Sequence, residues 1–258
     1  MILFSLLAFV VGLALGSFLN VLIYRLPRGE SIVHPSSHCP VCGEPIKWYD
    51  NVPLVSFLIL KGRCRSCTSP ILWRYPLVEG LTASLFLFSF ISHQPYSLSV
   101  PIFFFRDLIF MAFLIPIFFI DLEKEIIPNT LSYPLIIVGL AFALFSQSFS
   151  SSLVGIGLGA GLFFVIRIVS FFFLKQESMG FGDVKLAAGI GSFLGWSQAL
   201  LSFFLSFLLG AVISAFLLAL HIKGRKDRIP FAPFLVSASI ISLYFGQELV
   251  RLYGSLLY

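Results

Sequence analysis

Residues 2–28 read "ILFSLLAFVVGLALGSFLNVLIYRLPR". The stretch is apolar as far as Tyr24, and Arg25 and Arg28 follow. A helix of roughly 20 apolar residues is long enough to cross the hydrocarbon core of a bilayer. A cleavable leader would carry basic residues before its apolar run and small residues at its end, and this stretch shows neither. The run therefore predicts a retained first transmembrane helix, with Arg25 and Arg28 holding its end in the cytoplasm.

The composition of the whole chain extends this prediction. Of the 258 residues, 58% are hydrophobic, 11% are charged and 31 are Phe, which is far from the usage of a soluble domain. We therefore expect an all-α polytopic membrane protein with about eight transmembrane helices, of which the sixth is short and rich in glycine. The candidate segments lie near residues 2–24, 77–93, 101–120, 131–147, 152–174, 184–196, 198–220 and 231–250.

The basic residues indicate the topology of these segments. The formal net charge of +5 could suggest a nucleic-acid ligand, but the Lys and Arg residues gather in the loops 25–74 and 221–228. The positive-inside rule accounts for them as cytoplasmic loops, so we expect no nucleic-acid partner and place both termini outside. Adjacent residues point to different sides of a helix, so we also expect no ion pair between Arg106 and Asp107.

All four cysteines lie in the first basic loop, as two C-x-x-C pairs: Cys39 with Cys42, and Cys64 with Cys67. This pattern is typical of a zinc ribbon, in which four thiolates surround one tetrahedral Zn²⁺. Four protein ligands leave no open position for a catalytic water, so the predicted zinc is structural. Disulfides and free thiols are the alternatives, and a reducing cytoplasm disfavours the disulfides.

Two aspartates stand at the edges of apolar segments. Asp121 follows segment 101–120 and Asp183 precedes segment 184–196, and the two crossings between them return the chain to the cytoplasmic face. Two neighbouring carboxyl groups that share a proton can act as the acid and the base of an aspartic protease. The alternatives are a loop residue for Asp121, a helix cap for Asp183, or a proton or ion relay in a small transporter.

These segments together resemble the type IV prepilin peptidases, which are membrane aspartic proteases of the GxGD type. The resemblance lies in "GSFLNVLIYRLPRG" (16–29), the cysteine loop with "RYPLVEGLTA" (74–83), "DLEKEIIPN" (121–129), "GFGDVKLAAGIG" (180–191) and "IPFAPFL" (229–235). The last segment departs from the family pattern, because Ala232 stands where we expect Gly.

The resemblance implies a protein of the bacterial inner membrane whose catalytic face is cytoplasmic. Its substrates would be prepilins and pseudopilins of type IV pili or type II secretion, cut after a glycine at the membrane boundary. Asp121 and Asp183 match the catalytic pair, and Gly180, Gly182 and Lys185 match the motif around the second aspartate. The lysine would screen charge near the pair or anchor the protein to lipid headgroups.

Members of the family with a cysteine loop also methylate the new N-terminus with S-adenosylmethionine, so the resemblance implies this cofactor as well. Glu79 is an acid beside the loop that could contact the incoming amine, or could pair with Arg74 or another loop cation. A peptidase without methyltransferase activity is the alternative. We expect three regions: a first transmembrane helix (1–24), a cytoplasmic zinc-ribbon-like domain (25–76) and the peptidase domain (77–258).

Overall fold

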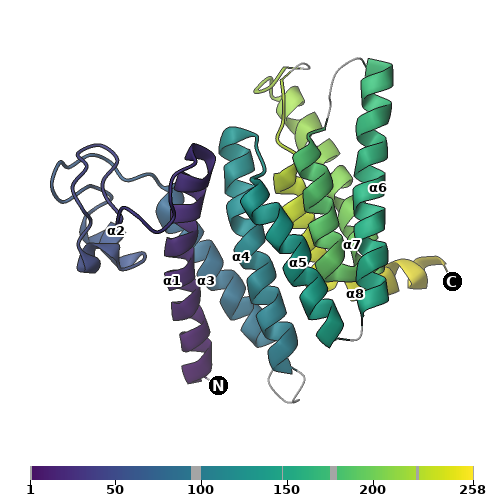
Figure 1. Ribbon diagram of the computed structural model, residues 1–258, viewed down its shortest axis with the longest axis horizontal. Coiled ribbons are helices and arrows are strands. Elements are labelled where there is room, and N and C mark those ends of the chain that lie inside the picture. The colour runs from purple at the N-terminus through teal and green to yellow at the C-terminus, as the bar shows by residue number, and fades with distance from the viewer. Residues whose placement is uncertain (1, 94–99, 147, 175–178, 225–226, 258) are drawn as a thin grey trace. The chain divides into compact units, whose positions relative to one another are not determined.

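The computed structural model describes residues 2–93, 100–146, 148–174, 179–224 and 227–257 (Figure 1). Within these residues the chain consists of helices and turns, with two isolated β-bridges in the cysteine loop. It divides into two compact units, Met1–Pro116 and Ile117–Tyr258. The predicted all-helical architecture is confirmed.

The helices follow one another with short connections, apart from the cysteine loop. Their bounds are α1 (Ile2–Arg25), α2 (Val55–Ile59), α3 (Arg74–His93), α4 (Val100–Lys124), α5 (Asn129–Phe145), α6 (Phe149–Leu174), α7 (Phe181–Ala219) and α8 (Ala232–Leu257), with 3₁₀ turns at Leu26–Arg28 and Trp48–Asn51.

Six of these helices, α1, α3, α4, α6, α7 and α8, are long and apolar enough to cross a membrane, as far as the described residues go. The apolar helix α5 has 17 residues and falls just short of this length. The protein is therefore a multi-pass membrane protein, as expected. The predicted count of eight is approximate, because the sixth and seventh segments both lie within α7.

In the first unit, α1 packs closely against α3 through a pair of glycines spaced four residues apart. A Cβ atom added to Gly12 would lie 2.6 Å from the Cα of Ala83, and one added to Gly16 would lie 2.7 Å from the Cα of Glu79. Small residues at this spacing let helix backbones approach each other in a membrane, where the hydrophobic effect does not drive helix association. The glycines of α1 thus fix the position of Glu79.

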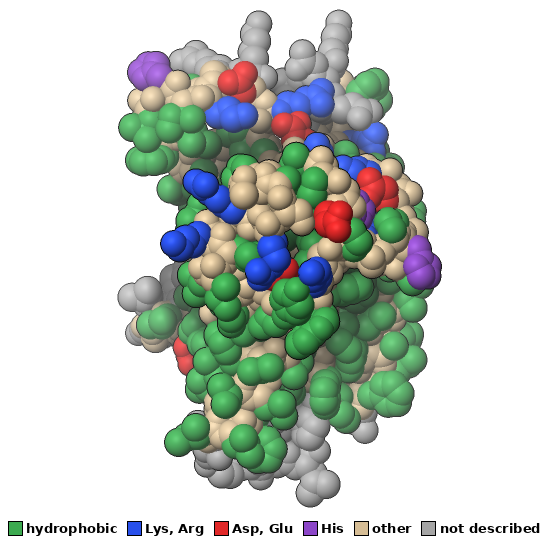
Figure 2. All heavy atoms as spheres, turned by 90° about the vertical axis from the view of Figure 1, so that its left-hand side faces the viewer, with side chains coloured by type: hydrophobic (Ala, Val, Ile, Leu, Met, Phe, Trp, Pro, Cys, Tyr) green, Lys and Arg blue, Asp and Glu red, His purple; other side chains and the backbone are tan. Residues whose placement is uncertain are grey.

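The connection between α1 and α3 carries most of the charged side chains of this unit. Figure 2 shows Lys and Arg side chains gathered over this loop, whereas hydrophobic side chains cover the helical surface below it. On α1, Leu3, Phe4 and Val10 are all more than half exposed. Such a surface suits contact with lipid, and the loop suits contact with water.

A cluster of ionisable side chains lies at the other end of α3 and at the start of α4. Arg106 Nε and Nη2 lie 2.9 Å and 2.8 Å from Asp107 Oδ1, and His93 Nε2 lies 3.3 Å from Asp107 Oδ2. The expectation that Arg106 and Asp107 form no ion pair is therefore wrong. The arginine side chain is long enough to bend around the helix, and the buried carboxylate of Asp107 stabilises that conformation.

In the second unit, α7 is the longest helix and departs from helical geometry at Gly195, where φ is 72° and ψ is 175°. A straight helix of its 39 residues would be roughly 58 Å long, about twice the thickness of the hydrocarbon core. Glycine can adopt this backbone conformation without strain because it has no Cβ atom.

Contacts with α6 show that the chain reverses its direction at this break. A Cβ atom added to Gly159 of α6 would lie 2.5 Å from the carbonyl oxygen of Ala187 and 3.1 Å from the ring of Phe203. These two residues are equally distant from Gly195 along the chain, on either side of it. The two limbs of α7 therefore form a hairpin, and both pack against α6.

The hairpin predicts that Gly195→Ala destabilises the protein. A side chain at this backbone conformation costs about 1–3 kcal/mol, and the added Cβ would also lie 2.5 Å from the Oγ of Ser151. We expect thermal unfolding in detergent at a temperature several degrees lower than that of the unmodified chain.

The matched control is Gly157→Ala in α6, where an added Cβ meets no atom within 4 Å. Because alanine favours a helix more than glycine does, this variant should unfold at the same or a slightly higher temperature. Equal unfolding temperatures for Gly195→Ala and Gly157→Ala would contradict the reversal at Gly195.

Candidate active site and metal centre

Asp121 lies in the last turn of α4 and is 5% exposed. Its Oδ2 accepts a hydrogen bond of 3.1 Å from the backbone N–H of Ala232, the first residue of α8. The first N–H groups of a helix have no partner within the helix, and they attract negative charge. The start of α8 therefore satisfies Asp121, and Asp121 in turn caps α8.

Asp183 is the third residue of α7 and is also buried. Its Oδ2 accepts a hydrogen bond of 3.2 Å from the N–H of Gly180, so the carboxylate reaches back to the residue that precedes the helix. The carboxyl group of Asp121 is close enough to that of Asp183 for the two to interact electrostatically. The two aspartates thus lie near each other within the second unit.

Gly182 and Lys185, on either side of Asp183, contact different residues. A Cβ atom added to Gly182 would lie 2.9 Å from the Cβ of Ile127, so the chain before α5 packs directly on the backbone there. The Nζ of Lys185 donates a hydrogen bond to Asn129 Oδ1, and it lies 5.3 Å from the ring centre of Tyr133. Lys185 therefore joins α7 to the start of α5, with an attraction between its ammonium and the aromatic ring.

Glu79 lies in α3 of the first unit and is 8% exposed. Its Oε2 accepts a hydrogen bond of 2.8 Å from the N–H of Leu54, and the Ser17 side chain is also hydrogen-bonded to the carboxylate. Leu54 has a φ of 58°, a conformation that costs energy for a leucine. Glu79 thus tethers the cysteine loop to the pair formed by α1 and α3, and these two partners carry no charge.

The four cysteines gather in the same loop through two turns of the same design. In the first, the N–H of Cys39 donates to Glu44 O at 2.9 Å and the N–H of Gly43 donates to Cys39 O at 2.9 Å. In the second turn, the N–H of Cys64 donates to Ser69 O at 2.9 Å and the N–H of Thr68 donates to Cys64 O at 3.0 Å. Each turn also contains a residue with positive φ, Gly43 or Thr68. This repeated geometry points two thiols of each turn toward the same place.

The resulting cluster has the dimensions of a tetrahedral metal site. The four sulfur atoms of Cys39, Cys42, Cys64 and Cys67 all lie within 4.8 Å of one another, and Sγ of Cys39 is 3.8 Å from Sγ of Cys67. Four sulfurs at about 2.3 Å from a central zinc would lie roughly 3.8 Å apart. The cluster could therefore bind a metal ion, and its donors suit a thiophilic one.

The surroundings of the thiols divide the cluster into acidic and less acidic members. Burial raises the pKa of the Cys39 thiol, but hydrogen bonds from the backbone of Cys42 and Val41 outweigh this and hold the pKa at about 6. A hydrogen bond from the Glu44 backbone lowers the pKa of Cys42, whereas burial and the neighbouring thiols raise it, to about 11. Crowded thiolates repel one another, and a bound dication relieves this repulsion.

Sequence patterns did not predict two of the groups that hold these sites. The backbone N–H of Ala232 binds Asp121, although the sequence drew attention to this residue only as a departure from glycine. The backbone N–H of Leu54 binds Glu79. Backbone donors have no residue-type signal, and only the proline after Ala232, typical of a helix start, marks one of the two positions.

Comparisons with known proteins identify the family of the chain. Residues 10–93 match the bacterial peptidase A24 N-terminal domain, and residues 108–215 match the type IV leader peptidase family. The chain belongs to the type IV leader peptidase family. The resemblance noted in the sequence is confirmed.

Several relatives within the leader peptidase family are named prepilin leader peptidase/N-methyltransferase. The protein of Myxococcus xanthus (strain DK1622) is 40% identical over 84% of this chain, which spans 64% of that protein's length. The protein of Aeromonas hydrophila is 36% identical over 96% of this chain and 92% of its own length, and that of Klebsiella pneumoniae is 40% identical over 74% and 85%. No solved structure matches the chain significantly.

The sulfur cluster of this leader peptidase predicts one bound metal ion per chain. Cys42→Ser removes one of four ligands, so elemental analysis of the purified variant should find most of the metal lost. Because the metal joins the two turns, the loop between α1 and α3 should then be cut faster by a protease.

The matched control is Ser66→Ala, which changes an exposed residue between two of the cysteines. This variant should keep the metal and the protease resistance of the unmodified chain. Metal-free protein whose loop resists proteolysis as well as the metal-bound form would refute the role given to the cluster.

Proposed function

We propose that this protein is a membrane aspartic endopeptidase that removes the leader peptide of type IV prepilins and pseudopilins. The observation that carries the proposal is the arrangement of Asp121 and Asp183, two buried carboxyl groups that interact electrostatically at helix ends. Membership of the leader peptidase family and the names of the relatives support the same activity. We assign cleavage to these two aspartates.

The proposed reaction divides acid and base chemistry between the pair. Two neighbouring carboxyl groups share one proton, so one of them is charged and the other is neutral. The charged carboxylate takes a proton from water, whose oxygen attacks the scissile carbonyl carbon. The neutral carboxyl group protonates the carbonyl oxygen, and a proton passes to the departing amine as the C–N bond breaks.

The hydrogen bonds to the pair position it for this reaction. Each aspartate uses its Oδ2 to accept one backbone N–H, from Ala232 for Asp121 and from Gly180 for Asp183. A carboxyl group held by one oxygen keeps the other oxygen for water or substrate. The close packing of Ile127 on Gly182 holds the backbone beside Asp183.

The location of the proposed cleavage follows from the substrate. A prepilin has a short basic leader followed by a hydrophobic helix, so its scissile bond lies where the helix leaves the membrane. We place the protein in the bacterial inner membrane with Asp121 and Asp183 at the cytoplasmic face, in contact with lipid around its helices. The basic loop residues support this orientation.

We further propose that the protein methylates the new N-terminus with S-adenosylmethionine. In this step the amine nitrogen attacks the methyl carbon, the bond from that carbon to sulfur breaks, S-adenosylhomocysteine leaves, and the amine loses a proton. The relatives' names support this second activity. We assign it to the region 25–76, and cleavage to the region 77–258.

Zinc is the metal that we propose for the sulfur cluster. Four thiolate donors at tetrahedral spacing suit Zn²⁺, and they fill its coordination sphere. When bound, the ion would stabilise the fold of the loop and would take no part in the chemistry. Cys39, Cys42, Cys64 and Cys67 would be its ligands.

Replacement of either aspartate tests the peptidase assignment. Asp121→Asn and Asp183→Asn keep the shape of the side chain and an oxygen acceptor, but they remove the ability to exchange a proton. Each should slow cleavage of a purified prepilin at least roughly 100-fold, as followed by the mass of the product.

The matched control is Asp227→Asn, an exposed aspartate in the loop before α8. It should cleave at the normal rate. Normal cleavage by either Asp121→Asn or Asp183→Asn would rule out the catalytic pair.

The Ala232 hydrogen bond provides a second test of the pair. Ala232→Pro removes the N–H that binds Asp121, and the first position of a helix tolerates proline. We expect cleavage to slow by up to about 100-fold, because Asp121 loses its fixed position. Ala232→Gly keeps the N–H and should retain activity; similar rates for the two variants would argue against positioning by this bond.

Methylation has its own readout in the same assay. With S-adenosylmethionine present, the cleaved pilin should gain one methyl group, roughly 14 mass units, and it should gain none when the donor is left out. A product of unchanged mass in both reactions would leave a peptidase without methyltransferase activity.

A further inference from the structure

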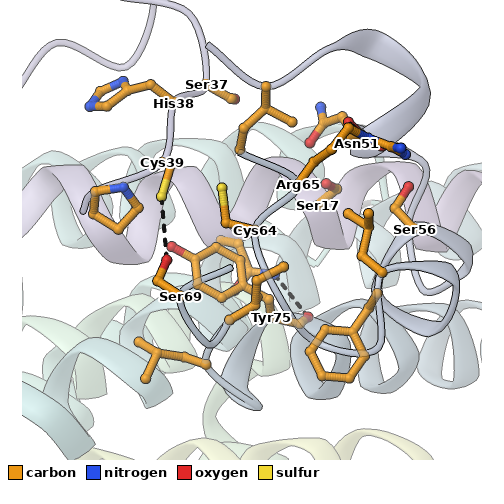
Figure 3. Close-up of a pocket in the computed structure, with 18 of the residues that line it drawn as sticks. Ser17, Ser37, His38, Cys39, Asn51, Ser56, Cys64, Arg65, Ser69 and Tyr75 are labelled. Atoms are coloured by element: carbon orange, nitrogen blue, oxygen red, sulfur yellow. Dashed lines mark hydrogen bonds and ion pairs between the residues drawn. The ribbon is translucent and has the colours of Figure 1, made fainter. Parts of the chain in front are cut away.

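The first unit contains a pocket between the cysteine loop and the helices α1 and α3 that the peptidase reaction does not use. Its volume is about 340 Å³, within the range of small-molecule sites, roughly 300–1,000 Å³. Figure 3 shows Ser17, Tyr75, Cys39 and Cys64 around it. The helices form its floor and the loop forms its walls.

One buried polar atom of the floor lacks a partner. Asn20 is 2% exposed, and its amide Nδ2 donates a hydrogen bond of 3.0 Å to the carbonyl oxygen of Tyr75. Because a carbonyl can only accept, the amide nitrogen must face Tyr75, and Oδ1 must face the other way. Among the described residues, Asn20 Oδ1 has no hydrogen-bond donor. A buried acceptor without a donor costs free energy, and a ligand with an N–H group would satisfy it.

The second group of the floor is the carboxylate of Glu79. Its partners, the Leu54 N–H and the Ser17 side chain, carry no charge. A carboxylate can accept about four hydrogen bonds, so it retains the capacity to bind a cation. Ser17, which is hydrogen-bonded to Glu79, and Asn20 lie on the same face of α1, less than one turn apart, and Ser17, Asn20 and Glu79 all line the pocket.

A buried cation lines the same pocket. Arg25 is 5% exposed, and its guanidinium donates to the carbonyl oxygens of Ser31 and Pro35, at 2.9 Å and 2.7 Å. These partners are neutral, and the five N–H groups of a guanidinium exceed the bonds that they make. The pocket is therefore lined by an anionic group, Glu79, and by a cationic group, Arg25.

We propose that this pocket binds the zwitterionic amino-acid end of an adenosyl methyl donor, with its α-ammonium group on Glu79 and Asn20 and its α-carboxylate toward Arg25. The assignment rests on the proposed methyl transfer for the identity of the ligand. A peptide N-terminus offers the same ammonium group, but it brings no carboxylate beside it. The site thus favours the donor over the methyl acceptor.

Binding to the purified full-length chain in detergent tests this assignment with two matched probes. S-adenosylhomocysteine carries the amino-acid end, and methylthioadenosine has the same nucleoside but lacks that end. We expect S-adenosylhomocysteine to bind at least tenfold more tightly in calorimetry. Equal affinities for the two probes would overturn the proposal, even without any variant.

Glu79→Gln gives the second arm. The variant keeps an oxygen that can accept the Leu54 N–H, so the loop should remain in place, as thermal unfolding can check. It should bind S-adenosylhomocysteine about tenfold more weakly or worse, because the ammonium loses its charged partner. Asn20→Ala should weaken the same probe as well. Unchanged affinity in Glu79→Gln would refute the site.

The matched control is Glu30→Gln, which removes an exposed carboxylate of the same loop that does not line the pocket. It should bind S-adenosylhomocysteine like the unmodified chain. A third probe, a short apolar peptide with a free N-terminus, distinguishes the other source of an ammonium group. Binding of the peptide, and not of S-adenosylhomocysteine, that depends on Glu79 would overturn the assignment to the donor.

The assay separates this proposal from the proposed function. Binding of S-adenosylhomocysteine that depends on Glu79 supports the site whether or not methyl transfer is observed. If methyl transfer occurs and Glu79→Gln binds the probe normally, the pocket assignment fails and the methyltransferase activity stands.

Discussion

The hydrogen bond from the Ala232 N–H to Asp121 connects the end of α4 with the start of α8. A carboxylate at the end of an apolar helix needs a donor from the protein, because water reaches such a place poorly. The same bond satisfies an N–H group that α8 cannot satisfy itself. One hydrogen bond thus satisfies both the Asp121 carboxylate and an N–H group at the start of α8. The proposed peptidase site lies at this contact.

In the first unit a buried carboxylate also accepts a backbone N–H group, but here the donor lies in a loop. Glu79 accepts the N–H of Leu54, and this bond holds a polar loop against apolar helices. The glycines of α1 bring the backbone of α3 close enough to place that carboxylate. The loop itself is too short to bury a large core, and its four thiols gather at a point where a metal ion could join its two turns. Glu79 therefore orients the cysteine loop, and the four thiols lie together inside that loop.

Much of this fold could be predicted from the sequence, because apolar runs and basic loops follow directly from the physics of a bilayer. The cysteine spacing likewise predicted a cluster of four sulfurs, since two C-x-x-C turns can present their thiols to one point. The ion pair of Arg106 and Asp107 was predicted wrongly, because helix geometry says where side chains start and not how far a flexible one can reach. The donors at Ala232 and Leu54 could not be predicted, since every residue but proline offers the same N–H group.

The sequence predicted the reversal at Gly195 only in part. It indicated two segments but not the backbone conformation that joins them. The reversal has a consequence for the geometry of the proposed catalytic pair. The limb from Phe181 to Gly195 is too short to cross a bilayer alone, and its far end packs against α6 at Ser151 and Gly155. The length of this limb therefore determines the position and orientation of Asp183 relative to the rest of the unit. One inserted residue would shift that carboxylate by about 1.5 Å and rotate it by about 100°, so the length of this limb is as much a part of the site as its side chains.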